Sequence, residues 1–169
     1  MAGDATAFAR IVAATSDRLV RLSARIVGRV EDAEDTVQES YLRAYRALVA
    51  GQFDRQASVR TWLYRIVTNA SIDVRRSRRP VAVGNEADAA ATEAPPGQGS
   101  PAGTEARVAL AELARWLDVL PDEQRVALLL SAVEGLTSIE IGQIMGCSEG
   151  AVEQRLVRAR VALRRQRGE

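Results

Sequence analysis

The chain has 169 residues, of which 23 are basic and 22 acidic, so its formal net charge is only +1. Any binding of a polyanion must therefore come from local basic clusters. One cysteine and no histidine exclude a disulfide framework and make a Cys/His zinc site implausible. There is no run of about 18 apolar residues and no signal-peptide pattern, which predicts a cytosolic protein without membrane insertion.

Residues 1–80 are expected to be helical throughout, because apolar residues recur at helical spacing with few breakers. Within 32–50 the inward stripe consists of Val37, Tyr41, Ala44 and Leu48. Four polar residues gather on or near the other side, in the first two turns: Glu34, Asp35, Gln38 and Glu39. Acids suit the start of a helix, but four polar residues around one helix end could equally form a docking surface for a basic partner.

After a loop at 51–57, Ser58 is placed to cap a helix that carries more aromatics than its apolar face needs, Trp62 and Tyr64. Asn69 and Asp73 share one face, and the arginines that follow are Arg75, Arg76, Arg78 and Arg79. Rings that stack on bases, an amide that reads base edges and arginines that neutralise phosphates would suit opened DNA. Alternatively, the rings belong to the core and the arginines form a solvated helix end. Spacing alone leaves both interpretations open.

Residues 81–105 carry four acids, no basic residue and clustered Pro and Gly, which predicts a flexible linker. Residues 106–169 resume helical periodicity, and no sustained strand alternation is visible. The prediction is an all-α protein with two small helical domains, 1–80 and 106–169, joined by this linker. Each domain is small enough to be only marginally stable alone.

The segment 136–165 is typical of a helix-turn-helix. Thr137 and Glu140 have the spacing of a capping box at the start of the first helix. Gly146 suits the left-handed backbone at its end, and Ser148 is placed to cap the second helix.

The second helix of this motif has two contrasting faces. Its apolar stripe consists of Val152, Leu156, Ala159 and Leu163, and the opposite face carries Gln154, Arg158, Val161 and Arg165. A recognition helix in a major groove needs such a division, although a surface helix with solvated arginines would show it too. The agreement of caps, turn and basic face favours DNA binding.

The resemblance to a known family rests on three segments: DAEDTVQESYLRAYRAL, SVRTWLYRIVTNASIDVRR and LPDEQRVALLLSAVEGLTSIEIGQIMGCSEGAVEQRLVRARVALRR. Together they resemble the sigma factors of bacterial RNA polymerase, and they are most similar to the extracytoplasmic-function subfamily, which keeps only the second and fourth conserved regions. The resemblance implies a factor that binds core RNA polymerase and promoter DNA and directs transcription initiation. It also implies that the aromatic helix melts and reads the −10 element.

By position, the resemblance assigns roles to residues of this chain. The surface for the polymerase clamp helices would be Asp35, Gln38 and Glu39. The −10 set would be Phe53 beside a flipped base, the reading residues Trp62, Tyr64, Asn69 and Asp73, and the phosphate contacts Arg75 and Arg76. The −35 set would be Ser148, Glu153, Gln154, Val157 and Arg158, with Arg155 and Arg160 nearer the DNA backbone. The linker would thread the polymerase between the two domains, and an anti-sigma factor is a possible further partner.

Glu153 departs from the family, in which this position is commonly basic or small. We hypothesise that it contributes to an unusual −35 preference by accepting a hydrogen bond from a cytosine amino group. Alternatively, it points sideways into solvent. Two other functions stay open: a dimeric helix-turn-helix regulator that binds operators, and an interaction protein that mimics a sigma factor. Enzymatic activity, a cofactor and a metal site are not expected, because the chain has no histidine, cysteine pair or Gly-rich phosphate loop.

Overall fold

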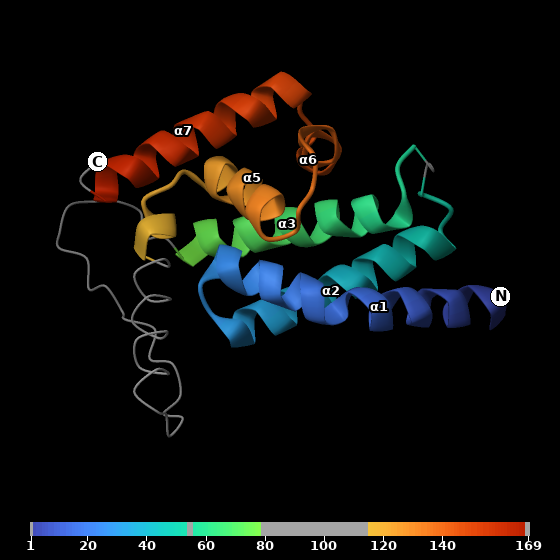
Figure 1. Ribbon diagram of the computed structural model, residues 1–169. Helices are drawn as coiled ribbons and strands as arrows, with labels where there is room; N and C mark the ends of the chain where they lie inside the picture. Colours follow the sequence, from blue (N-terminus) through green and yellow to red (C-terminus); the bar gives the residue numbers. More distant parts are fainter. Residues whose placement is uncertain (1, 54–55, 79–114, 168–169) are drawn as a thin grey trace.

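The computed structural model describes residues 2–53, 56–78 and 115–167, and all regular secondary structure in these ranges is helical (Figure 1). The N-terminal bundle consists of α1 (Ala2–Val27), α2 (Val30–Val49) and α3 (Val59–Arg78). The C-terminal bundle consists of α5 (Asp122–Ala132), α6 (Ser138–Met145) and α7 (Glu149–Arg167). The all-α prediction is confirmed, whereas the predicted linker at 81–105 lies outside the described residues.

The N-terminal bundle forms around the apolar stripes of its three helices. The chain reverses between α1 and α2 at Gly28, whose φ of 94° is a backbone conformation that favours glycine. On α2 the expected stripe is buried at Val37, Tyr41 and Ala44, whereas Leu48 is half-buried. The fully buried large side chains of the bundle are Leu19, Leu22, Ile26, Val37, Leu63, Tyr64 and Val67.

The C-terminal bundle places α5 and α6 against the apolar face of α7. Its fully buried large side chains are Leu120, Val126, Leu130, Ile141 and Val152. A closely packed interior of this kind fixes the orientation of α7, since most helix stability in proteins comes from packing of one face.

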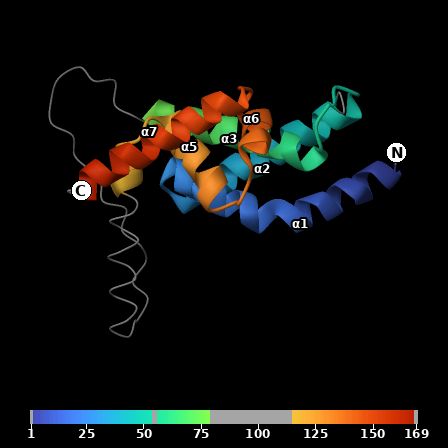
Figure 2. The ribbon, with the colours of Figure 1, turned by 45° about the horizontal axis from the view of Figure 1, so that its top comes forward.

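The two bundles also pack against each other. Helix α5 lies between α3 and α7 in Figure 1, and the two bundles are also adjacent in the second view, in Figure 2. Helix α1 contacts α5, α3 contacts α6, and one continuous apolar cluster includes residues of both bundles. The two domains were predicted from the sequence, but a contact between them was not, so their packing is a finding of the structure. None of the described helices combines the length and the apolar character needed to cross a membrane.

Candidate nucleic-acid interface

Local hydrogen bonds build the helix-turn-helix as the sequence predicts. The Thr137 hydroxyl accepts from the Glu140 N–H at 3.3 Å, and the Glu140 carboxylate accepts from the Thr137 N–H at 2.8 Å. This capping box holds the pKa of Glu140 below its usual value, first through the Thr137 backbone and then through its hydroxyl. Gly146 ends α6 with φ 65°, and the Ser148 hydroxyl accepts from the Ala151 N–H at 3.3 Å at the start of α7. Each predicted cap is confirmed.

The turn between α6 and α7 brings two stretches of backbone into close contact. The Cys147 N–H donates to the Gly142 carbonyl at 3.0 Å. Gly142 is buried, and a Cβ added there would lie 2.7 Å from the Cys147 carbonyl oxygen. Glycine at this position therefore lets the turn sit against α6 and sets the direction in which α7 leaves.

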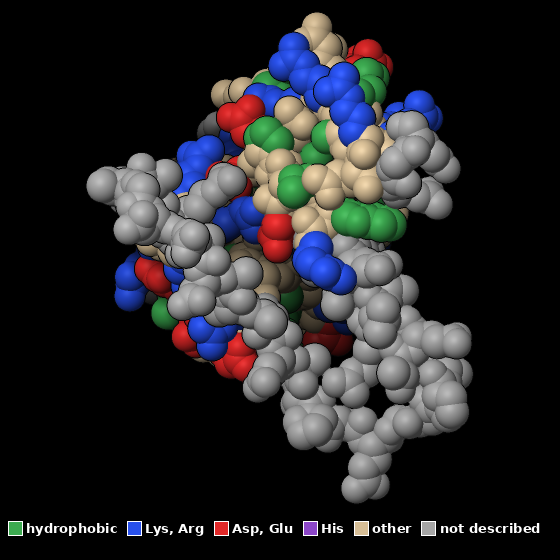
Figure 3. Space-filling view, turned by 90° about the vertical axis from the view of Figure 1, so that its left-hand side faces the viewer, with side chains coloured by type: hydrophobic (Ala, Val, Ile, Leu, Met, Phe, Trp, Pro, Cys, Tyr) green, Lys and Arg blue, Asp and Glu red, His purple; other side chains and the backbone are tan. Residues whose placement is uncertain are grey.

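Helix α7 presents its apolar stripe to the core and its polar face to solvent. Val152, Leu156 and Ala159 are buried. The outward residues are exposed: Glu153, Gln154, Val157, Arg158, Arg160, Val161 and Arg165. Figure 3 shows basic side chains gathered at the top of this view, over α7. The predicted −35 residues on this face are thus together on one accessible surface, apart from Arg155.

Arg155 lies differently from the other arginines of α7. Its guanidinium contacts the Cys147 sulfur and pairs with Glu123 of α5, with 2.8 Å between Nη2 and Oε2. The side chain is only 23% exposed. In this structure Arg155 therefore ties the turn and α5 to α7.

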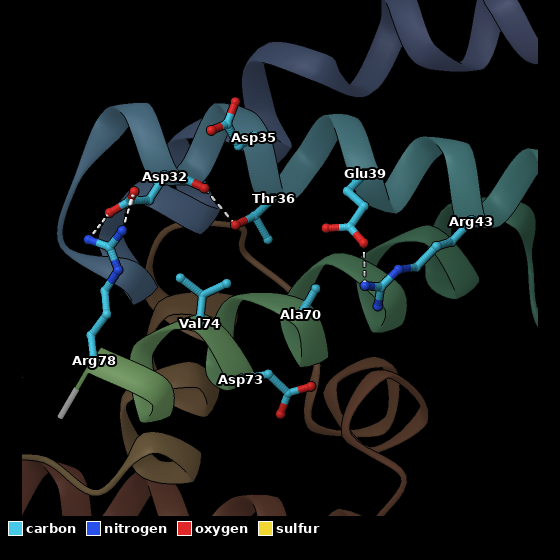
Figure 4. Close-up of a pocket in the computed structure, with 9 residues that line it drawn as sticks. All are labelled: Asp32, Asp35, Thr36, Glu39, Arg43, Ala70, Asp73, Val74 and Arg78. Atoms are coloured by element: carbon cyan, nitrogen blue, oxygen red, sulfur yellow. Dashed lines mark hydrogen bonds and ion pairs between the residues drawn. The ribbon is translucent and has the colours of Figure 1, made fainter. Parts of the chain in front are cut away.

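The three residues predicted to bind polymerase, Asp35, Gln38 and Glu39, are exposed on α2. Glu39 accepts from the Arg43 guanidinium at 2.5 Å. A pocket of about 260 Å³ lies between α2 and α3, and four of its lining residues are acidic: Asp32, Asp35, Glu39 and Asp73 (Figure 4). Arg78 and Arg43 line the same pocket and pair with Asp32 and Glu39, so Asp35 is the α2 carboxylate of this pocket that is most available to a basic partner.

The aromatic residues before and within α3 have different environments. The rings of Phe53 and Trp62 lie 5.0 Å apart at 47°, and both residues are half-buried. Asn69 and Asp73 are exposed one turn apart on α3, and Figure 4 shows Asp73 pointing away from α2. The predicted −10 residues thus form two separate groups: the aromatic pair lies at one end of α3, and the two polar side chains lie farther along the helix.

Three residues predicted to touch −10 DNA are instead engaged with the C-terminal half of the chain. Tyr64 is 1% exposed, and its hydroxyl donates to Glu134 at 2.7 Å. Arg75 and Arg76 bond the two oxygens of Asp122, at 2.9 and 3.1 Å. In this conformation Tyr64 and Arg75 cannot reach DNA, so their role in DNA binding stays a prediction.

Four residues on the other side of these contacts were not predicted from the sequence: Asp118, Asp122, Arg125 and Glu134. Burial and neighbouring charges shift pKa values in this region. Burial first, then Glu134, raises the pKa of Tyr64 to about 12. Burial would raise the pKa of Asp118, but hydrogen bonds from Arg125 and Arg75 outweigh it and lower the pKa. The available signal was weak, since each acid lies near Pro121 or Gly135, where a charged residue is ordinary.

Two family models match the chain in the order of its bundles: Sigma-70 region 2 over residues 11–81, and Sigma-70, region 4 over residues 110–163. The ECF RNA polymerase sigma factor SigW of Bacillus subtilis is 36% identical over 172 residues, which covers 97% of this chain and 90% of SigW. The chain belongs to the extracytoplasmic-function (ECF) sigma factors. The resemblance seen in the sequence is therefore confirmed.

Other relatives agree with this family. The RNA polymerase sigma-H factor of Pseudomonas aeruginosa is 34% identical over 172 residues, covering 95% of this sigma factor and 86% of the relative. Among solved structures, CnrH in complex with the cytosolic domain of CnrY matches with a TM-score of 0.72 and 28% identity, over 98% of this chain and 90% of CnrH. RpoE of Bartonella quintana, solved with the anti-sigma factor NepR, shares the fold at a TM-score of 0.69 and 23% identity, over 94% of each chain.

Proposed function

We propose that this sigma factor binds core RNA polymerase, directs it to promoters by recognising −35 and −10 elements, and helps to melt the DNA. The observation that carries the proposal is the outward face of α7, where Gln154, Val157 and Arg158 are exposed opposite a buried stripe. Arginine can bond guanine and glutamine can bond adenine through two hydrogen bonds each, and an apolar side chain can contact the thymine methyl group. A capped helix-turn-helix holds these groups on a rigid element.

The other −35 residues flank this reading face. Ser148 lies at the start of α7, where backbone N–H groups and the helix dipole favour a phosphate. Arg160 is exposed one turn or less from Arg158 and would contact the DNA backbone, as would Arg155 after release from Glu123. Glu153 lies beside Gln154 on the exposed side, in reach of a cytosine amino group if α7 enters the major groove.

The N-terminal bundle would supply −10 recognition. Phe53 and Trp62 form an aromatic site that could capture a flipped base, which offsets the few kcal/mol needed to unstack it. Asn69 and Asp73 would read base edges from the exposed side of α3. Arg75 and Arg76 at the end of α3, and Tyr64 nearer its start, would contact the DNA strand once the C-terminal bundle moves away.

Protein partners are expected on the acidic side of α2. Asp35, Gln38 and Glu39 are exposed there and would dock on the clamp helices of core polymerase. CnrH and the Bartonella RpoE were solved with CnrY and the anti-sigma factor NepR, which supports an anti-sigma factor as a further possible partner of this chain.

Binding, not catalysis, is the implied mechanism. Each domain offers a small DNA contact, and the net charge of +1 gives little general attraction to DNA. Tethering two weak contacts on polymerase raises their effective concentration and strengthens binding by about 10²–10⁴-fold. Promoter recognition should therefore be strong only in the presence of core polymerase.

The test is run-off transcription with core polymerase on a random promoter library, followed by sequencing of the transcribed templates. The wild type should select two elements at the −35 and −10 spacing and produce permanganate-reactive thymines at −10. Arg158→Ala should weaken selection at one −35 position by about 1–3 kcal/mol. Arg10→Ala removes an arginine that is also exposed, but on α1, and should leave selection unchanged.

Three results would count against the proposal. If the purified chain failed to associate with core polymerase, the proposed function would be wrong. Tight binding to a palindromic site without polymerase would indicate a dimeric regulator. Association with polymerase without permanganate reactivity on any promoter would indicate a protein that mimics a sigma factor.

A further inference from the structure

Glu123 and Arg155 form an ion pair that lies entirely within the C-terminal bundle. Oε2 of Glu123 on α5 is 2.8 Å from Nη2 of Arg155 on α7. Nη1 of the same guanidinium donates to the sulfur of Cys147, in the turn before α7. Because all three residues belong to one bundle, these contacts do not need the N-terminal bundle.

This ion pair lies at the edge of the outward face of α7. Glu123 and Arg155 line a pocket of about 480 Å³ together with Gln154 and Arg158, two of the residues proposed to read −35 bases. A helix that reads bases in the major groove lies between two phosphate backbones, and contacts to these backbones fix its position. A phosphate beside Gln154 and Arg158 would therefore meet the Arg155 guanidinium and, next to it, the Glu123 carboxylate.

Glu123 binds Arg155 in the way that a phosphate would. Carboxylate and phosphate oxygens accept from the same N–H groups of a guanidinium. In the free protein, the carboxylate thus neutralises the charge that would attract DNA and places a negative charge beside it. The other acid that lines this pocket, Asp122, is buried and pairs with Arg75 and Arg76, so Glu123 is the exposed acid of this pocket.

Exchange of Glu123 for a phosphate leaves neither side chain without compensation. The Glu123 side chain is 56% exposed, so water can hydrate its carboxylate after release. Glu123 also lies in the first turn of α5, where the helix dipole favours a negative charge. Arg155 keeps its contact with Cys147. Since a partly exposed ion pair contributes little to stability, a phosphate can replace this carboxylate.

We propose that Glu123 sets the affinity of this sigma factor for −35 DNA, because it occupies Arg155 in the free protein and must give it up to a DNA phosphate. This inference rests on the proposed function, in which Arg155 contacts the DNA backbone. Since Glu123 competes with phosphates and not with bases, it lowers the affinity for every DNA sequence by the same factor. It thereby adds to the dependence of promoter binding on core polymerase.

The test measures binding of the full chain, without polymerase, to two labelled duplexes by fluorescence anisotropy. One duplex carries the −35 element selected in the run-off experiment, and the other carries the same bases in scrambled order. Glu123→Gln removes the charge and keeps the shape of the side chain. It should tighten binding to both duplexes by about 2- to 5-fold at about 50 mM salt, and Glu123→Ala should do the same. The gain should shrink as the salt concentration rises, because phosphate contacts are salt-dependent.

A double variant shows whether Glu123 acts through Arg155. Arg155→Gln alone should weaken binding, and Glu123→Gln added to it should give no gain in affinity. Asp17→Asn is the matched control, since it removes an exposed carboxylate on α1, which lies on the far side of the molecule from α7 in Figure 1. It should leave binding unchanged. Circular dichroism confirms that each variant keeps its helices, and the two substitutions of Glu123 protect the test against one of them failing to fold.

The direction of the change decides the outcome. Tighter binding by the Glu123 variants that disappears in the Arg155→Gln background supports the proposal. Weaker or unchanged binding would overturn it, because the carboxylate would then hold Arg155 in place for DNA instead of competing with it. An equal gain with and without Arg155 would also overturn it, since Glu123 would then only repel DNA. The effect is expected on the scrambled duplex as well, so it can be measured even if the run-off experiment selects no −35 element, a result that would contradict the proposed function alone.

Discussion

Gly142→Ala tests whether the close contact in the helix-turn-helix is essential. In a helix interior this change is usually stabilising by up to about 1 kcal/mol, because alanine restricts the unfolded chain. At position 142 the added Cβ would lie 2.7 Å from the Cys147 carbonyl oxygen. That oxygen belongs to the turn backbone, which is held in place by the hydrogen bond from the Cys147 N–H to the Gly142 carbonyl.

The expected net effect is a destabilisation by about 1–3 kcal/mol. Forcing a methyl group into a packed site typically costs about 1–3 kcal/mol, and loss of the turn hydrogen bond adds about 1 kcal/mol. The gain in helix propensity offsets about 1 kcal/mol of this sum. Gly150→Ala is the matched control, since position 150 is exposed in α7 and no described neighbour lies within 4 Å of an added Cβ.

Urea denaturation of the two variants measures these effects as shifts in the midpoint at unchanged slope. Gly150→Ala should match the wild type or exceed its stability by up to about 1 kcal/mol. Gly142→Ala should also weaken binding to −35 DNA, because α7 would leave the turn in another direction. The reasoning is refuted if Gly142→Ala is as stable as Gly150→Ala.

Two further predictions concern single side chains. Burial and Glu134 raise the pKa of Tyr64 from 10.0 to about 12, so the contribution of this hydroxyl to stability is complete below pH 10 and is lost as the pH rises toward 12. Burial also raises the pKa of Tyr41, so tyrosinate absorbance should show more than one late ionisation step, and Tyr64→Phe should remove one of them. The same late titration in the wild type and in Tyr64→Phe would contradict the contact between Tyr64 and Glu134. Glu153→Ala should change the ranking of −35 sequences in the promoter library more than overall binding, and an unchanged ranking would show that Glu153 faces solvent.

Local features were predictable from the sequence because their causes lie within a few residues. The capping box needs only Thr137 and Glu140 three residues apart, and the left-handed turn needs only Gly146. The two faces of α7 follow from a period of 3.6 residues, and Val152 and Leu156 are buried as the pattern predicts. The polar residues of α2 are exposed for the same reason.

Contacts between the bundles were not predictable, because their partners are far apart in sequence. The arginine tract at the end of α3 has the same pattern whether its partner is a phosphate, water or a carboxylate. The structure pairs Arg75 with Asp118 and Asp122, more than 40 residues later. Arg155 shows the same ambiguity on α7, where a cation expected near DNA pairs with Glu123. Composition indicates positive charge but not which anion meets it.

Tyr64 indicates how the contact between the two bundles could have been inferred from chemistry. A phenol that is buried needs a partner for its hydroxyl, otherwise phenylalanine would fill the space at lower cost. On α3 itself the Arg60 guanidinium lies 5.5 Å from the centre of the Tyr64 ring, and the hydroxyl donates to Glu134, 70 residues away. Glu134 in turn is buried only because Tyr64 and Arg18 compensate its charge. Each of the two polar groups thus makes burial of the other tolerable, and neither has this partner unless the two bundles are packed together.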